Sequence, residues 1–307
     1  MPFIQLNSLY WEAAQKLYRR KLVLICLGII AVYILVALLG IFNLLPDYRV
    51  KVGDGYEVPS LSVAKIFGTD IFGYSVLYKI LAGTKTAILI GFVVTSISVP
   101  IGIILGALAG YYGGYVDAAV VWLYTVISSV PYILMVIAIS YVIGKGLIAI
   151  CLAMGLVGWV GLCRLIRSEV LKTRSLEYVS AAKVVGANDI QIIFSHILPN
   201  VLHLAVISAS LQILGAIKSE VILTFLGVGI QSGDSWGSMI SDSKGELVQG
   251  IWWPLAGVVL AMFLLIYSLN VVSDALRDAL DPKLRGSTEV AEGDAQFEGQ
   301  ATGVQKA

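Results

Sequence analysis

Long apolar stretches constrain this sequence more than any other feature. A helix that crosses a bilayer needs about 20 consecutive apolar residues, and residues 22–45 supply the first such stretch without a single charge. That stretch exceeds the length of a signal-peptide core, so we interpret it as a retained anchor. Five more stretches follow, at residues 86–109, 118–143, 146–163, 201–230 and 251–273. The sequence therefore predicts an all-α integral membrane protein with six transmembrane helices.

The composition agrees with a lipid environment. Hydrophobic residues make up 58% and charged residues 13% of the chain, against about 45–50% and about 25% in soluble domains. A core of 307 residues does not need that much apolar surface, but a bilayer does, because side chains that face lipid must also be apolar. The net charge of +1 gives no attraction for nucleic acid. The lipid bilayer is thus an expected partner, and nucleic acid is not.

Lys and Arg residues set the expected orientation. They gather before the first span, between the fourth and fifth spans, and after the sixth span. These groups are Lys16, Arg19, Arg20 and Lys21; Arg164, Arg167, Lys172, Arg174 and Lys183; and Arg277, Lys283 and Arg285. Six spans put all three groups on one side, which the positive charge predicts to be cytoplasmic. Both termini of this multi-pass protein of the cell (inner or plasma) membrane are then cytoplasmic.

The same topology predicts the organisation of the chain. Residues 1–45 form a cytoplasmic arm and the first span, and residues 46–80 form an external segment. Residues 81–285 form a transmembrane domain with a long cytoplasmic loop at 166–200. Residues 286–307 are polar and rich in small residues, which predicts a disordered tail.

The sequence lacks the residues of an energy-converting enzyme. A phosphate loop is absent, because its nearest match has Ile139 in place of the first glycine and Gly146 in place of Ser/Thr. We predict no catalytic residue and no cofactor bound by this chain. We also found no internal repeat of the kind that many secondary carriers contain. Energy is therefore expected from another protein, and a self-contained secondary carrier is the alternative of another class.

The cysteines and histidines predict no metal site. Cys26, Cys151 and Cys163 all lie within apolar stretches, where free buried thiols are the expected state. His196 and His203 are the only histidines, too few for a structural zinc site.

Glycines and prolines mark special positions within the spans. Gly102, Gly106 and Gly110 follow the small-xxx-small pattern that lets helices approach closely in lipid. The pattern predicts a tight contact, either within the chain or with a partner subunit. Pro100 and Pro131 lie in the second and third spans and are expected to kink those helices.

Two charges interrupt the fifth span. Counting along a helix puts Lys218 and Glu220 near its outer end, as an outer gate or a polar lining for solute. The alternative is a pair that merely extends to water. The external stretch at 231–250 follows; with residues 46–80 it either faces an external protein or simply closes the bundle.

The cytoplasmic loop has the pattern of a helix–turn–helix. A short amphipathic helix is predicted over residues 176–185, and Gly186 supplies its left-handed cap. Asn188 is expected to cap the next helix with Gln191 as its partner, and Pro199 to mark the start of the fifth span. Such a hairpin either docks another protein or lies on the lipid surface.

This loop resembles the EAA loop of ABC importer permeases, whose pattern is E-A-A-x-x-x-G followed by I-x-L-P. Ser180 stands in place of the glutamate and His196 in place of the isoleucine. The residues at matching positions are Ala181, Ala182, Gly186, Leu198 and Pro199. The histidine before I-L-P-N resembles the corresponding segment of the peptide-importer permeases.

Four more motifs resemble that subfamily, and the likeness extends from residue 23 to residue 285. They are Phe67-Gly68-Thr69-Asp70 with Gly73; Ala109-Gly110-Tyr111-Tyr112-Gly113-Gly114 with Asp117; Trp159-Val160-Gly161 with Arg164, Arg167 and Glu169; and Glu220 through Leu226-Gly227-Val228-Gly229 to Ser235-Trp236-Gly237. Tyr74-Ser75 replaces the usual R-D after Gly73, and Thr224 replaces a serine.

The resemblance implies a subunit of a larger machine, with the fold of a type I importer. A sister permease would share the path, two ABC ATPases would bind ATP and Mg²⁺, and an external binding protein would deliver solute. The loop residues expected to couple ATPase and permease are Ser180, Ala181, Ala182, Gly186, Asp189, Leu198 and Pro199. The resemblance implies dipeptides or oligopeptides as the solute. Nickel or another small solute is the alternative, because nickel importers share this permease type.

Overall fold

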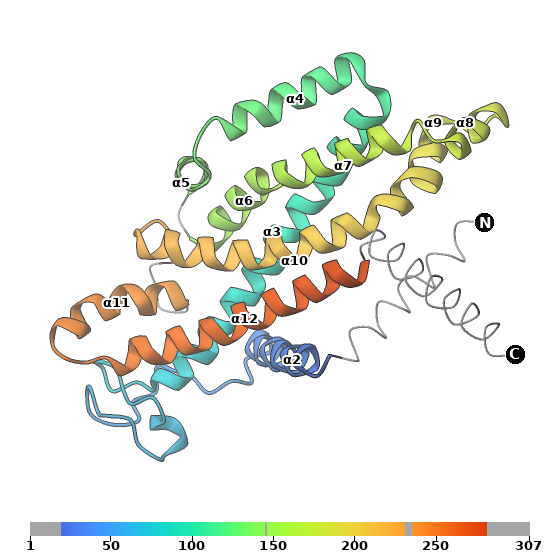
Figure 1. Ribbon diagram of the computed structural model, residues 1–307. Helices are drawn as coiled ribbons and strands as arrows, with labels where there is room; N and C mark the ends of the chain where they lie inside the picture. Colours follow the sequence, from blue (N-terminus) through green and yellow to red (C-terminus); the bar gives the residue numbers. More distant parts are fainter. Residues whose placement is uncertain (1–19, 145, 231–234, 281–307) are drawn as a thin grey trace, which may run out of the picture.

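The computed structural model describes residues 20–144, 146–230 and 235–280, which form a bundle of helices (Figure 1). Five continuous segments are long and apolar enough to cross a membrane. They are α2 (Lys21–Ile41); α3 (Val76–Tyr112); α6 (Leu147–Gly158) with α7 (Val160–Thr173); α9 (Asp189–Gln191), η2 (Ile192–Ile197) and α10 (Leu198–Phe225); and α12 (Trp253–Leu280). The helix α3 begins at Val76, so the end of the expected external segment 46–80 is already helical.

The third predicted span is not one kinked helix. It consists of α4 (Gly114–Ser128) and α5 (Tyr132–Ile143), and the two helices meet at an angle of 92°. Pro131 causes the break, because it lacks an N–H and disfavours the helical conformation in the residue before it. Pro131 itself is extended, with ψ of 132°. The six expected spans are therefore five continuous segments and one broken pair, whereas Pro100 remains inside α3.

The glycine pattern packs α3 against α7 within the chain. A Cβ atom at Gly102 would lie 3.0 Å from the carbonyl oxygen of Trp159, and one at Gly106 would lie 2.7 Å from that of Cys163. Gly110 approaches the backbone of α7 equally closely, at Arg167. The close contact predicted from the glycines is thus an internal one. The three cysteines are buried free thiols, as expected.

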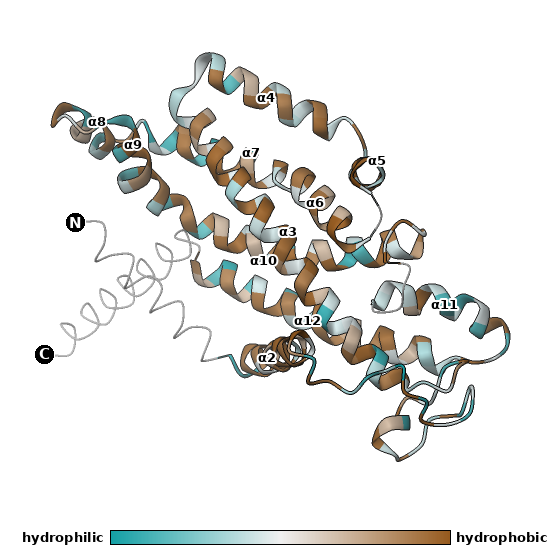
Figure 2. Cartoon of the chain, turned by 180° about the vertical axis from the view of Figure 1, so that it is seen from behind, coloured by the Kyte–Doolittle hydropathy of each residue, from teal (hydrophilic) through white to brown (hydrophobic). Residues whose placement is uncertain are grey.

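Elements outside the long apolar helices gather at the two ends of the bundle (Figure 1). The helices α8 (Glu177–Val184) and α9 lie at one end, whereas residues 46–75 with η1 (Val63–Lys65) and α11 (Trp236–Val248) lie at the other (Figure 1). Arg20 donates a 3.0 Å hydrogen bond to Asp278, so the start of α2 and the end of α12 lie together. Apolar residues cover α2, whereas hydrophilic residues are frequent on α11 (Figure 2).

Candidate functional site

The predicted helix–turn–helix is present at the end of the bundle that carries α8. Gly186 follows α8 with φ of 94°, in the left-handed region that favours glycine. The side-chain oxygen of Asn188 accepts a 2.8 Å hydrogen bond from the backbone N–H of Gln191 and caps α9. Local sequence alone therefore predicted the hairpin and the positions of Gly186 and Asn188 at the two helix ends.

The hairpin presents its tip outward and packs its other side on the bundle. Val184 and Val185 are each 88% exposed, and Ser180, Ala181 and Gly186 are exposed beside them. Ala182 instead packs on a buried cluster that includes Val179. An exposed apolar tip on a firmly seated hairpin is suited to contact with another protein.

A polar contact joins the hairpin to the end of α3. The hydroxyl of Tyr111 donates a 2.7 Å hydrogen bond to the carboxylate of Asp189. The ammonium group of Lys183 lies 5.1 Å from the centre of the Tyr111 ring, within cation–π range. Sequence analysis placed Tyr111 in one motif and Asp189 in another, and it missed Tyr111 as a site residue. The one sequence feature that pointed to a contact between them was the predicted cytoplasmic position of both motifs.

The hairpin continues into α10 without a break. The π-helical turn η2 lies directly before Leu198 and Pro199, both half-buried in the first turn of α10. Pro199 has no backbone N–H to donate. The side-chain amide of Asn200 donates a 2.9 Å hydrogen bond to the carbonyl oxygen of His196. The same amide donates to Tyr178 of α8 at 2.8 Å. Pro199 thus lies in the first turn of α10, as predicted. The helical segment nevertheless runs without interruption from α9 through η2 into α10.

Arginines of α7 and the residue after it hold neighbouring helix ends. The guanidinium of Arg167 forms a two-pronged ion pair with Asp117 of α4, and Arg164 donates to Ser128 at 2.8 Å. Arg174 donates to the carbonyl oxygen of Tyr111 at 3.0 Å, which caps α3. These contacts attach α4 and the end of α3 to the base of the hairpin.

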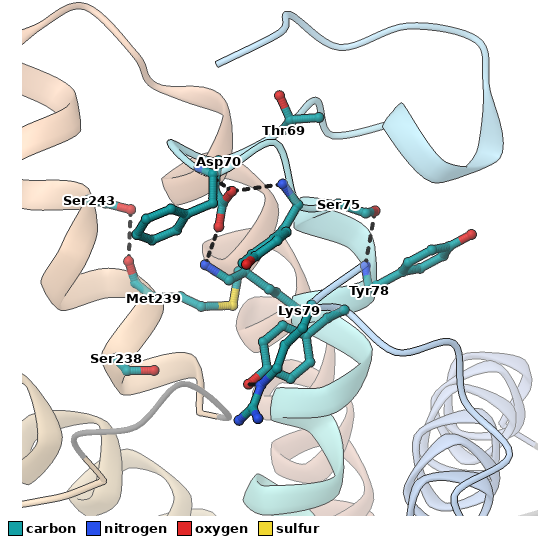
Figure 3. A network of polar contacts seen from close by, with 12 residues as sticks. Thr69, Asp70, Ser75, Tyr78, Lys79, Ser238, Met239 and Ser243 are labelled. Carbon is teal, nitrogen blue, oxygen red and sulfur yellow. Dashed lines mark hydrogen bonds and ion pairs between the residues drawn. The ribbon is translucent and has the colours of Figure 1, made fainter. Parts of the chain in front are cut away.

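The opposite end of the bundle carries a second polar network (Figure 3). Asp70 accepts 2.9 Å hydrogen bonds from the backbone of Phe72 and Tyr74, and it pairs with Lys79 in the first turns of α3. Ser75 caps α3 by accepting from the N–H of Tyr78. The Asp70 motif therefore folds residues 46–75 onto the start of α3.

Two tryptophan side chains add further hydrogen bonds at this end of the bundle. The indole of Trp253 donates to the carbonyl oxygen of Thr69 at 3.1 Å, and the indole of Trp236 donates to that of Ile80 at 3.1 Å. Gly83 leaves room for the Trp236 ring, since a Cβ atom there would lie 2.5 Å from it.

Lys218 and Glu220 do not act as a pair. Glu220 is buried, accepts a 2.9 Å hydrogen bond from Thr224, and shares another with Ser235. Lys218 is exposed. Residues two positions apart point to opposite sides of a helix, so the alternative of a pair that extends to water together does not describe Glu220.

Comparisons with known proteins agree with this architecture. Residues 102–286 match the family described as "Binding-protein-dependent transport system inner membrane component". The chain is 35% identical to the dipeptide transport system permease protein DppC of Bacillus subtilis, over 89% of this chain and 86% of that protein. It is 35% identical to the oligopeptide transport system permease protein OppC of Haemophilus influenzae, over 91% and 90%.

More distant likenesses support the same fold. The glutathione transport system permease protein GsiD of Pectobacterium atrosepticum is 34% identical, over 73% of this chain and 74% of that protein. A solved structure of the MetNI methionine ABC transporter, in an inward-facing conformation, has a TM-score of 0.51 at 18% identity. It covers 65% of this chain and 97% of that one.

The multi-pass bundle has the fold of a type I importer permease. The chain belongs to the family of inner membrane components of binding-protein-dependent transport systems.

Proposed function

We propose that this chain and a sister permease together form the path of an ATP-driven importer for peptides. The likeness to permeases named for dipeptide, oligopeptide and glutathione transport supports the solute class, since it extends over most of the chain. The observation that carries the coupling role is the hairpin 177–191, which exposes Val184 and Val185 while fastened to α3 through Asp189.

The remaining subunits follow from this role. Two ABC ATPases supply the chemistry with ATP and Mg²⁺, and this chain is the non-catalytic subunit. An external binding protein delivers solute to the end of the bundle that carries residues 46–75 and α11. The hairpin lies on the cytoplasmic side, where the ATPases work, and both termini of the chain are cytoplasmic. The contact of Arg20 with Asp278 supports a common side for the two terminal spans.

Two connections carry the motion of the hairpin into the membrane. One is the hydrogen bond from Tyr111 to Asp189, which leads to α3. The other is the unbroken helical path from α9 through η2 to α10. Closure of the ATPases would displace α8 and α9, and these two connections would re-pack the spans around the path.

Substitutions in the hairpin test the coupling role. Gly186→Val requires a β-branched residue at φ of 94°, which is strained, and Ala182→Glu adds charge where Ala182 packs on the buried cluster. Both variants should insert in the membrane yet lose solute-stimulated ATPase activity and peptide uptake. Lys172→Gln, an exposed residue of α7, is the control and should retain both.

The outcome also separates the alternatives. Normal peptide uptake by both hairpin variants, with the ATPase still bound, would contradict the coupling role. Uptake of nickel in place of peptide by the wild-type transporter would identify the other solute class of this permease type. Solute uptake in the absence of any ATPase subunit would indicate a self-contained carrier.

A further inference from the structure

A cavity with a mixed polar and apolar lining lies between α10, the α6–α7 junction and the start of α5. Its volume is about 280 Å³. One face of α10 contributes Gln212, Gly215 and Ser219, which follow helical spacing. The opposite wall includes Gly158 and Gly161.

The cavity lies at the middle depth of the spans. Gln212 is about 21 Å along α10 from Leu198 and about 20 Å from Phe225. Polar groups at this depth are costly in lipid and are usually directed to a bundle interior or to water. The polar groups of this cavity are therefore better suited to water or to the bundle interior than to hydrocarbon.

The walls of the cavity combine bare backbone with oriented polar groups. A Cβ atom added at Gly161 or at Gly215 would meet no other atom within 4 Å, so the backbone is open at both positions. The amide of Gln212 lies against Gly158, and a side-chain hydrogen bond joins Ser219 to Tyr132. An extended molecule with its own N–H and C=O groups finds matching partners along this wall.

Lys218 extends the polar face of α10. It is exposed and lies three residues after Gly215, on the same side of the helix. Within the part of the chain that the structure describes, no carboxylate pairs with its ammonium group. A lysine within a span is favoured where it faces water or an anionic group. Its position fits a carboxylate that enters from the outer end of α10.

We propose that Gln212, Gly215, Lys218 and Ser219 form the solute-contacting strip of this permease, and that Lys218 binds the carboxylate of the passing peptide. Gln212 and the open glycine backbone contact peptide amide groups. Glu220 points away from Lys218 on α10 and is instead hydrogen-bonded with Thr224 and Ser235. This inference rests on the proposed function only for the identity of the solute, because the accessibility of the strip does not depend on it.

Cysteine labelling in the assembled transporter tests whether the strip faces water. Gly215→Cys and Gly161→Cys are made in a background with Cys26, Cys151 and Cys163 replaced by alanine. Gly28→Cys on α2 is the matched control, because it is an exposed helical glycine of a span whose Cβ atom also meets nothing within 4 Å. A charged, water-soluble thiol reagent should label the first two during ATP-driven turnover and leave the control unlabelled.

A dipeptide with a free carboxylate, added with the binding protein, should slow labelling at Gly215→Cys. If both strip cysteines remain as unreactive as Gly28→Cys, the strip faces lipid and the inference is overturned. Labelling without protection by the transported peptide overturns the solute contact. If the wild-type transporter carries no peptide but the strip is labelled, the proposed solute is wrong while the aqueous path stands.

Substitution of Lys218 tests the carboxylate contact. Lys218→Met should reduce uptake of a subsaturating dipeptide by about tenfold, the loss expected for one charge-assisted hydrogen bond. Lys218→Arg should restore most of it, whereas Lys21→Met at the start of α2 should change nothing. Unchanged uptake by Lys218→Met would overturn the contact. Equal loss in Lys218→Met and Lys218→Arg would also overturn it, because the charge would then not be what matters.

Discussion

The hydroxyl of Tyr111 lies 2.7 Å from the carboxylate of Asp189, although the two residues are 78 positions apart. Tyr111 lies in the last turn of α3, and the first turns of this same helix bind Asp70 through Lys79 at the other end of the bundle. With 37 residues, α3 is about 56 Å long and exceeds the roughly 30 Å of bilayer hydrocarbon. One helix therefore connects residues 46–75 to the hairpin.

Removing the Tyr111 hydroxyl should loosen the hairpin. A hydrogen bond to a charged group contributes about 1.5–3 kcal/mol, so Tyr111→Phe should speed amide hydrogen exchange in α8 and α9 about tenfold or more. Tyr115→Phe is the control, since Tyr115 is 96% exposed. Asp189→Asn should give a similar change, and the double variant should add little to it. Unchanged exchange in Tyr111→Phe would show that apolar packing alone seats the hairpin.

The glycine contact between α3 and α7 should tolerate no side chain. A Cβ atom at Gly106 would be 2.7 Å from the carbonyl oxygen of Cys163 and 2.9 Å from Cβ of Ile166. Gly106→Val should destabilise the protein by about 3 kcal/mol, at the upper end of overpacking costs, measured as thermal stability in detergent. Gly28→Val, which meets nothing within 4 Å, should cost much less. Equal stability of the two variants would refute the close-packing argument.

The ion pair between Arg167 and Asp117 should show strong non-additivity. Their side chains are only 26% and 21% exposed, so Arg167→Met leaves a poorly solvated carboxylate without its partner. The cost should be about 3 kcal/mol. Adding Asp117→Leu removes the unpaired charge and should restore part of the lost stability. Thermal unfolding of both single variants and the double variant provides the cycle, and purely additive losses would contradict this account.

Glu246 should make stability depend on pH. Burial raises its pKa, as do Asp242 and Asp70, while a hydrogen bond with Ser243 and the charge of Lys79 oppose the shift. The unfolded pKa of a glutamate is about 4.3. When the folded-state pKa is higher, the protein loses stability as the pH rises from the unfolded pKa to the folded pKa. Above the folded pKa the loss stays constant. Glu246→Gln should thus be more stable than wild type at pH 7.

The advantage of Glu246→Gln should nearly vanish at pH 4, where the carboxyl group is mostly protonated in both states. Thermal unfolding of the purified transporter at the two pH values measures the difference. An advantage of equal size at both pH values would show that burial of the charge is not its origin.

The sequence alone determined the features that depend on local pattern. Apolar length identified the spans, and Gly186 with Asn188 identified the hairpin, because caps and spans are decided by neighbours within a few residues. Helix geometry could also have separated Lys218 from Glu220, since residues two positions apart never share a face. We missed that signal by treating the two charges as a pair.

Only the tertiary structure decided what distant segments do together. Pro131 predicted a kink, but the 92° angle between α4 and α5 depends on what each helix packs against. The buried carboxyl group of Glu220 has Ser235, at the start of α11, as one of its partners. The bond from Tyr111 to Asp189 requires α3 and the hairpin to reach the same point in space. Such contacts join residues that are far apart in the chain. Packing of whole helices decides which residues meet, and no local sequence pattern encodes that packing.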